Sequence, residues 1–170
     1  MAKLIRFNNN WKNYFAQEKE LFLDALPGQK IESVEHIGAT SVVLCATYGT
    51  IDLLCSIESS LDFVTIKNLL ERKGYIFVEE KSDYLKLLYF VRRNEAGNIV
   101  ATLRLVEYCS EEYNKIRAFK FYLRERQSNV DKYNQYRQTI LDNYGGDLKM
   151  YQELKSRYIE SVLKDHCEFK

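Results

Sequence analysis

The sequence predicts an α+β domain in which strands occupy the middle of the chain and helices occupy both ends. Its 170 residues fit one domain better than two, so we expect residues 1–170 to form a single domain. The content of 46% hydrophobic residues, with only 7 glycines and 1 proline, supplies a core and argues against a disordered or collagen-like chain. The spacing of apolar residues is helical near both termini and strand-like between them, which favours a mixed sheet covered by helices.

The first third of the chain alternates between helix and strand. Residues 8–26 place apolar side chains at helical spacing and end at a Pro-Gly pair, so a helix is predicted there. Residues 31–37 alternate between polar and apolar and predict a strand. Residues 39–47 are small and apolar, as in a loop with a short buried helix, and the nearly continuous apolar run 50–57 predicts a buried strand.

The remaining elements follow from turn and capping residues. Ser59, Ser60 or Asp62 is positioned to cap a helix that runs to Lys73, and Gly74 suits the position that follows its end. Three strands and then three helices complete the chain. We expect the strands at 75–79, 84–92 and 99–107, and the helices from 110, over about 129–142, and from 147.

Charge and cysteine content limit the classes of function. The formal net charge of +1 gives no global field for nucleic acid, although residues 115–137 are mostly basic. The four cysteines form no C-x-x-C pair, and the two histidines are not spaced for a zinc site. No run is long enough to span a membrane and the polar start lacks the apolar part of a signal peptide, so we expect a cytoplasmic protein without a membrane partner.

A turn between two predicted strands carries the most informative residues. Gly38 is followed by the hydroxyl residues Thr40 and Ser41, and such a turn presents backbone N–H groups and hydroxyls that can hold a phosphate. The next strand carries Asp52 within an apolar run, where a carboxylate must be solvated, paired or bound to a cation. Together these residues predict a phosphate site beside a candidate Mg²⁺ ligand.

The same region resembles a known family. The stretch EHIGATSVVLCATYGTIDLLCSI (35–57) resembles the GrpB-type family of uncharacterised proteins, whose pattern is roughly HIGSTSVPGL-x-AKP-x-IDI. The likeness extends over almost the whole chain, in the right order. The further similar motifs are Trp11-x-x-x-Phe15-x-x-Glu18, the segment FKFYLR that ends at Arg124, and Tyr151-x-x-x-Lys155-x-x-Tyr158-Ile159.

The resemblance implies a fold and a set of site residues. The family is usually placed in the nucleotidyltransferase superfamily, which has a DNA polymerase β-like mixed sheet, here with a helical C-terminal part. In that superfamily a Gly-Ser turn binds the triphosphate and strand carboxylates hold Mg²⁺. The residues so implied are Asp52 and His36 as catalytic groups, Gly38, Ala39, Thr40, Ser41 and Arg124 for phosphate, and Asp52 with Glu107 for the metal.

Several positions depart from the family and superfamily patterns. Ala39 replaces the serine of the Gly-Ser pair, and Leu54 stands where a nucleotidyltransferase carries its second acid. The family's later H-x-H falls at Thr102-Leu-Arg104, so both histidines are absent. A two-metal mechanism needs two or three carboxylates, and beside Asp52 only Glu107 or Glu18 is available.

Each candidate also has a structural alternative. His36 can be a strand-end histidine hydrogen-bonded to the backbone, and Asp52 can be an acid that caps a turn or pairs with an arginine. Arg117, Lys120 and Arg124 share one helical face, which is most often a solvated surface. Lys155 could reach the site, although an exposed lysine is the more common outcome.

Two functions of different classes follow. The first is a protein that binds a nucleotide or other phosphorylated metabolite at Gly38–Ser41 and Asp52, with Mg²⁺-dependent nucleotidyl transfer if it is catalytic. The second is a non-catalytic interaction module that keeps the fold and binds protein or nucleic acid through its basic strip at 115–137. Convergence of Asp52, His36 and a second acid would favour the first, whereas filling of the site by Tyr48 or Arg104 would favour the second.

Overall fold

The chain forms the α+β architecture that the sequence predicts. The computed structural model describes residues 3–57, 62–78, 87–144 and 147–166. In chain order its elements are α1 (Trp11–Ala25), β1 (Ile31–Ile37), the 3-10 helix η1 (Ala39–Ser41), β2 (Ile51–Ile57), α2 (Phe63–Arg72), β3 (Tyr75–Val78), β4 (Leu87–Arg93), β5 (Ile99–Glu107), α3 (Glu111–Glu125), α4 (Gln127–Tyr144) and α5 (Leu148–His166).

The strands form one mixed sheet of five strands in the order β1-β2-β5-β4-β3. β2 and β5 are its parallel pair, and the other neighbouring strands are antiparallel. The near-continuous apolar sequence of β2 is explained by this position, because neighbouring strands flank it on both sides and side chains cover both of its faces. The register places Asp52 directly beside Thr102 of β5 and opposite Ile37 of β1.

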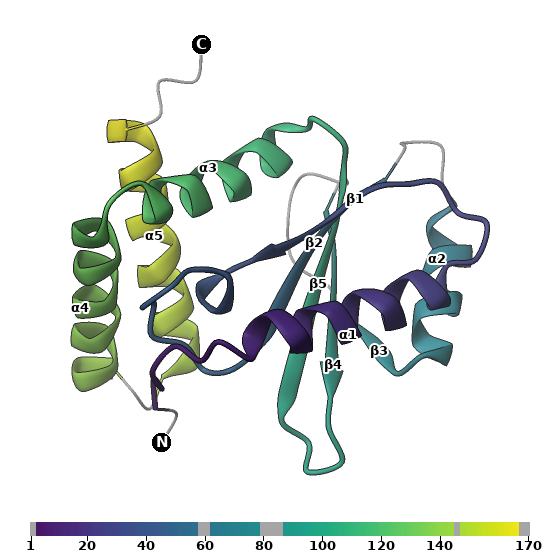
Figure 1. Ribbon diagram of the computed structural model, residues 1–170, viewed down its shortest axis with the longest axis horizontal. Helices are drawn as coiled ribbons and strands as arrows, with labels where there is room; N and C mark the ends of the chain where they lie inside the picture. Colours follow the sequence, from purple (N-terminus) through teal and green to yellow (C-terminus); the bar gives the residue numbers. More distant parts are fainter. Residues whose placement is uncertain (1–2, 58–61, 79–86, 145–146, 167–170) are drawn as a thin grey trace.

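One face of the sheet is covered by α1 and α2. Figure 1 shows the two helices on the same side of the sheet, and their apolar residues join one core with the strands. Phe22 of α1 and Leu70 of α2 are fully buried there with Leu53 and Leu103 of the central strands. Burial of side chains of this size contributes about 1.5–3 kcal/mol each, so this layer is a main source of stability.

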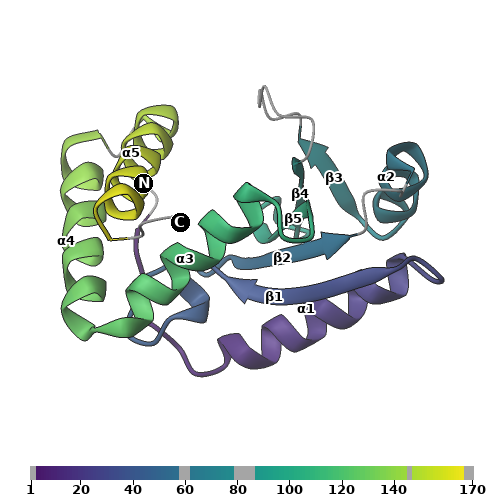
Figure 2. The same ribbon diagram turned by 90° about the horizontal axis from the view of Figure 1, so that it is seen from above.

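The opposite face is covered only in part, by α3. Figure 2 shows α3 on the other side of β1 from α1, and a small cluster of Ile37, Leu54, Val106 and Tyr113 joins it to the sheet. The helices α4 and α5 lie side by side beyond the end of the sheet (Figure 1) and pack instead against the loop that follows η1. The part of this face that carries Asp52 therefore lies toward the C-terminal helices.

Capping residues act where the sequence predicts them. The Asp62 carboxylate accepts hydrogen bonds from the N–H groups of Val64 at 3.2 Å and Thr65 at 3.1 Å, and Ser110 caps α3 through the N–H of Tyr113. The predicted strand ends at Glu79 and Tyr84, the alternative caps Ser59 and Ser60, and the Gly145-Gly146 break lie outside the described residues.

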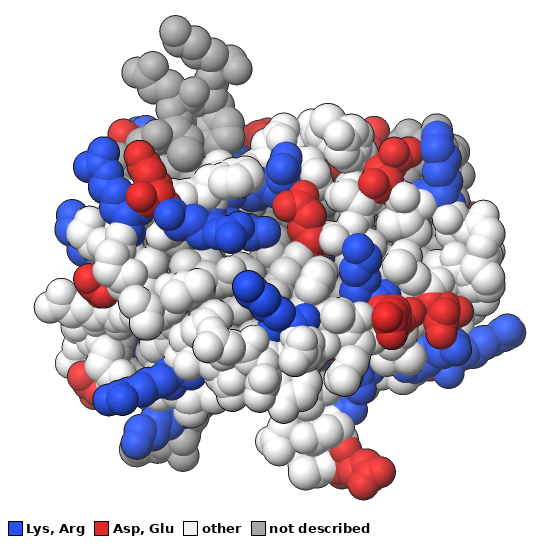
Figure 3. Space-filling model, in the orientation of Figure 1, with Lys and Arg blue, Asp and Glu red and all other residues white. Residues whose placement is uncertain are grey.

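The surface carries mixed charges. Figure 3 shows basic and acidic side chains interspersed over the face seen in Figure 1, in keeping with the net charge of +1. Within the described residues, no helix is both long and apolar enough to cross a membrane.

Candidate functional site

Asp52 is held between two strands and the turn that follows β1. Its Oδ1 accepts a hydrogen bond of 2.5 Å from the Thr102 hydroxyl on the parallel neighbour β5. Its Oδ2 lies against Gly38, because a Cβ built on that glycine would sit 2.1 Å from this oxygen. Gly38 has φ +69° and ψ −172°, a conformation that is essentially restricted to glycine. The turn therefore needs glycine both for its backbone and for its contact with the carboxylate.

Two cations act on the same carboxylate. Arg104 follows Thr102 by two residues on β5 and so points to the same face of the sheet as Asp52. Lys155 lies on α5 one turn after the buried Tyr151 and shares its helical face. Burial raises the pKa of Asp52, while the Thr102 hydroxyl and the charges of Lys155 and Arg104 act in the opposite direction. We call Asp52, Thr102, Arg104 and Lys155 the Asp52 cluster.

The loop from η1 to β2 is fixed to the C-terminal helices. Asn134 of α4 accepts a hydrogen bond from the N–H of Ala46 at 2.9 Å and donates one to the carbonyl of Leu44 at 3.0 Å. The Arg137 guanidinium donates to the Ala46 carbonyl and lies 4.2 Å from the ring centroid of Tyr133. Arg137 is only 3% exposed, so the hypothesis that the whole basic strip 115–137 is a surface is wrong at this residue.

Two tyrosines extend this connection toward the site. The Tyr48 ring meets that of Tyr151 edge-on at a centroid distance of 5.7 Å. Burial is the main cause that raises the pKa of Tyr133 on α4, and the neighbouring charge of Arg137 acts in the opposite direction. Tyr48 itself is 37% exposed, so it borders the region between the loop and α5.

His36 faces the other side of the sheet. It pairs with Leu53, whereas its neighbour Ile37 pairs with Asp52, and successive strand side chains alternate between faces. Its ring stacks on Phe15 of α1 at 4.6 Å with an interplanar angle of 3°. The structure therefore does not bring His36 and Asp52 together as one catalytic pair.

The histidine instead fastens the turn. The Thr40 hydroxyl donates its proton to the Thr50 carbonyl at 3.1 Å, so the contact of 2.9 Å between His36 Nε2 and Thr40 Oγ1 requires the imidazole to donate. Burial, with the charge of Lys120 as a smaller cause, lowers the pKa of His36 to about 4. The imidazole is consequently neutral at physiological pH and acts as a hydrogen-bond donor within the fold.

The other turn residues also have partners inside the protein. The Ser41 hydroxyl donates to the Gly38 carbonyl at 2.7 Å, which tightens η1. Ala39 has no hydroxyl and packs against the cluster formed by the loop and the C-terminal helices. Phosphate contact by Gly38, Ala39, Thr40 and Ser41 stays a prediction, and it would use the backbone of the turn more readily than its hydroxyls.

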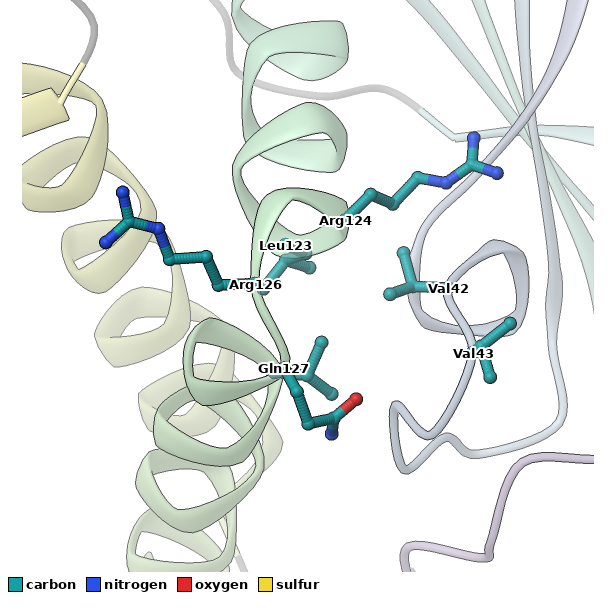
Figure 4. Close-up of a pocket in the computed structure, with 7 residues that line it drawn as sticks. Val42, Val43, Leu123, Arg124, Arg126 and Gln127 are labelled. Atoms are coloured by element: carbon teal, nitrogen blue, oxygen red, sulfur yellow. The ribbon is translucent and has the colours of Figure 1, made fainter.

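Arg124 lies at a different place. It lines a small pocket between the end of α3, the start of α4 and the loop, and Figure 4 shows its side chain extending past Val42 while Arg126 points the other way. The residues that line this pocket are Val42, Val43, Leu123, Arg124, Arg126, Gln127 and Val130. Arg124 is therefore a candidate for a separate surface. The charges of Lys155 and Arg104 act on Asp52, although the Arg104 guanidinium also lies over the ring of Tyr89 at 5.6 Å.

The predicted carboxylates for Mg²⁺ do not converge. Glu107 pairs with Ile57, five residues along β5 from the Thr102 that pairs with Asp52, which is roughly 17 Å of strand. Glu18 is 4% exposed, forms an ion pair with Arg92, and accepts a hydrogen bond of 2.7 Å from the Tyr75 hydroxyl. Among the described residues no group of three or more His, Cys, Asp or Glu side chains could hold a metal ion. The donor set therefore does not fit a two-metal centre, and Mg²⁺ binding stays a prediction without a complete ligand set.

The sequence alone does not predict that Thr102, Arg104 and Lys155 are site residues. Thr102 and Arg104 occupy the positions of the family's H-x-H, which was the available signal that this part of β5 belongs to the site. Lys155 lies in a family-like motif, but its isolated position gave no reason to prefer a site over a solvated surface. Their convergence follows from the pairing of β2 with β5 and from the packing of α5.

Comparison with protein families places this geometry in context. The model of the family described as GrpB protein matches residues 2–165. The chain belongs to the GrpB family. It is 24% identical over 165 residues to the glutamate-rich protein GrpB of Alkalihalophilus pseudofirmus, an alignment that covers 95% of this chain and 94% of that protein. The resemblance in the sequence motifs is thus confirmed.

Solved structures confirm the fold of this GrpB-family chain. The conserved protein GrpB from Enterococcus faecalis aligns with a TM-score of 0.83 at 22% identity and covers 96% of both chains. The Cid1 poly(U) polymerase, in a structure with MgGTP bound, aligns with a TM-score of 0.53 at 11% identity over 88% of this chain and 50% of that one. The fold is therefore similar to that of a poly(U) polymerase, in line with the nucleotidyltransferase fold that the family resemblance implies.

Proposed function

We propose that this GrpB-family protein binds the phosphate group of a nucleotide or other phosphorylated metabolite at the Asp52 cluster. The observation that carries the proposal is that Arg104, two residues after Thr102 on β5, lies on the same face of the sheet as Asp52, and that the charge of Lys155 on α5 also acts on this carboxylate. Arginine and lysine are the side chains that bind phosphate in proteins, through paired N–H groups and a point charge respectively.

The surroundings of the cluster support this proposal. The turn at Gly38 brings backbone against Asp52, and the partly exposed ring of Tyr48, which packs on Tyr151 of α5, is available to stack on a base. The fold is shared with nucleotidyltransferases, which makes a nucleotide the first ligand to test. A cytoplasmic location is part of the proposal, and it is supported by the free thiols of Cys45, Cys55 and Cys109 among the described residues.

A ligand panel tests the proposal directly. The full chain is titrated by calorimetry, and in parallel by thermal shift, with nucleoside mono-, di- and triphosphates, sugar phosphates and the matching unphosphorylated nucleosides. We expect saturable binding by at least one phosphorylated compound and none by its nucleoside. Affinity should fall in Arg104→Gln and stay unchanged in Arg72→Gln, a control at the end of α2. Absence of binding by every phosphorylated compound, with and without Mg²⁺, would refute the proposal.

A second candidate is a protein-interaction module, which is favoured because His36 and Glu107 do not meet Asp52 whereas Arg104 lies on its face of the sheet. Val43 and Leu44 are each 59% exposed beside the Arg124 pocket, and Leu44 has a φ of +61° that the Asn134 hydrogen bond holds in place. An apolar tip next to two arginines suits an amphipathic acidic peptide. A synthetic Leu/Glu helical peptide should bind to the full chain and lose affinity in Val43→Asp. Equal affinity for the wild type and the variant would remove this candidate.

A further inference from the structure

The charge balance around Asp52 differs from that of a metal site. The Asp52 carboxylate is in contact with the protein on both oxygens, through the Thr102 hydroxyl at 2.5 Å and through the close approach of Gly38. The position two residues further along β2, on the same face, is Leu54, which is fully buried in an apolar cluster. Glu35 of β1, opposite Leu54, is another carboxylate on this face, but it is paired with Arg117 and Lys120. The charges that act on Asp52 are those of Lys155 and Arg104.

This arrangement is poor for a divalent cation and suitable for an anion. Mg²⁺ in proteins is held by carboxylates together with substrate phosphates, and two-metal centres need carboxylates that converge. Here the described residues give no such convergence, since Glu107 lies near the other end of β5 and Glu18 is paired with Arg92. The cations whose charges act on Asp52 are Lys155 and Arg104.

We infer that the Asp52 cluster binds a phosphate monoester without a divalent metal ion, with Arg104 and Lys155 supplying the positive charge and Asp52 orienting them. The inference rests on the proposed function and narrows its ligand class. A phosphate monoester carries a charge of about −1.5 to −2 near neutral pH. The two cations exceed the charge of an ionised Asp52 by one, so a ligand of low negative charge suits the cluster best. A triphosphate carries more negative charge than these two side chains can compensate without a metal ion. Asp52 is on this account a positioning residue and does not touch the ligand.

The test compares monophosphates with and without metal. Wild-type protein is titrated by calorimetry with AMP, GMP, CMP, UMP and ribose 5-phosphate, first in EDTA and then in MgCl₂. We expect the same affinity in both solutions. Arg104→Gln and Lys155→Gln should each weaken binding by about 10-fold or more, as expected for the loss of a charge-assisted hydrogen bond. Arg157→Gln on the same helix is the matched control, because Arg157 is exposed and pairs with Glu153, and its affinity should equal that of the wild type.

Conservative variants distinguish the roles of Arg104 and Asp52. Arg104→Lys keeps the charge but loses the planar fork, so its affinity should lie between those of the wild type and Arg104→Gln. This variant also serves if Arg104→Gln fails to fold, which circular dichroism would reveal. Asp52→Asn should weaken binding equally in EDTA and in MgCl₂, because a positioning residue acts through the two cations.

The possible results distinguish the inference from the proposed function. Binding that occurs in MgCl₂ but not in EDTA, and that Asp52→Asn abolishes, would overturn the metal-free inference while leaving phosphate binding intact. Binding in EDTA that is unaffected by Arg104→Gln and by Lys155→Gln would overturn the assignment of the two cations. No binding of any phosphorylated compound in either solution would overturn the proposed function itself.

Discussion

Substitution of Gly38 by alanine should destabilise the fold more than any comparable change at another glycine turn. The new Cβ would sit 2.1 Å from Asp52 Oδ2, and the backbone angles of φ +69° and ψ −172° are essentially restricted to glycine. The backbone strain costs about 1–3 kcal/mol, and forcing the carboxylate away costs about 1–3 kcal/mol more by analogy with overpacking. Gly38→Ala should therefore lower the free energy of unfolding by about 2–6 kcal/mol.

Gly28 provides the matched control. It has φ +75°, but a Cβ there would meet no atom within 4 Å, so Gly28→Ala should cost only the backbone strain of about 1–2 kcal/mol. Urea unfolding followed by circular dichroism measures both. With a slope near 2 kcal/mol per M, Gly38→Ala should lower the midpoint by about 1–3 M.

A double variant isolates the contact with the carboxylate. In an Asp52→Ala background most of the steric part of the Gly38→Ala cost should be removed, because only the Cβ of residue 52, at 3.1 Å, would remain in close contact. The cost should therefore fall toward that of Gly28→Ala. Two results would refute the close approach of the turn to Asp52. One is an equal loss of stability in Gly38→Ala and Gly28→Ala, and the other is a loss at Gly38 that is the same in the wild type and in Asp52→Ala.

Three further predictions concern buried charge. The ring of His36 should titrate near pH 4 by NMR, in a signal that His36→Gln removes. Because this pKa lies below the ordinary histidine value of 6.5, folding stability should be lost as pH falls from 6.5 toward 4, and a titration midpoint near 6.5 would contradict the burial of the ring. Glu18→Ala should lower the free energy of unfolding by about 3 kcal/mol, because it leaves Arg92 without its ion-pair partner. Glu153→Ala, which removes an exposed ion pair, should lower it by less than about 1 kcal/mol, and similar urea midpoints for the two variants would contradict this difference. The pKa of Asp52 in the folded protein is raised above 3.8, so the free energy of unfolding of the wild type should decrease as pH rises above that value. Asp52→Asn should lack this decrease, and parallel stability–pH curves for the two proteins would contradict the raised pKa.

Local patterns in the sequence predict most of the fold. The strands at 31–37 and 99–107 have the predicted ends, because alternation and turn residues determine both. The predicted helix over 8–26 extends three residues too far at its start, since the asparagines before Trp11 form a turn and the N-cap Asn10 makes no side-chain hydrogen bond. The loop at 39–47 contains only the short helix η1, because its remaining backbone groups bond to α4 instead.

The site is harder to predict than the fold because it depends on which strands pair. Asp52 and Gly38 were identified from residue type and from the family resemblance. His36, only two residues before Gly38, points to the opposite face, and that follows from the antiparallel pairing of β1 with β2. Thr102 and Arg104 reach Asp52 through the parallel pairing of β2 with β5, about fifty residues apart in sequence, which no local pattern reveals. Arg137 looked like one of several surface cations, yet long-range packing buries it under the loop.

The central claim is that a phosphate binds at the Asp52 cluster. The most direct measurement is an NMR titration of ¹⁵N-labelled protein with a nucleoside monophosphate in EDTA, with the same nucleoside as control. We predict that the largest amide shifts occur at Gly38–Ser41, Asp52, Thr102–Arg104 and Lys155, and that the nucleoside produces none of them. Shifts confined to the pocket of Val42, Val43 and Arg124, or no shifts with the monophosphate, would contradict the claim.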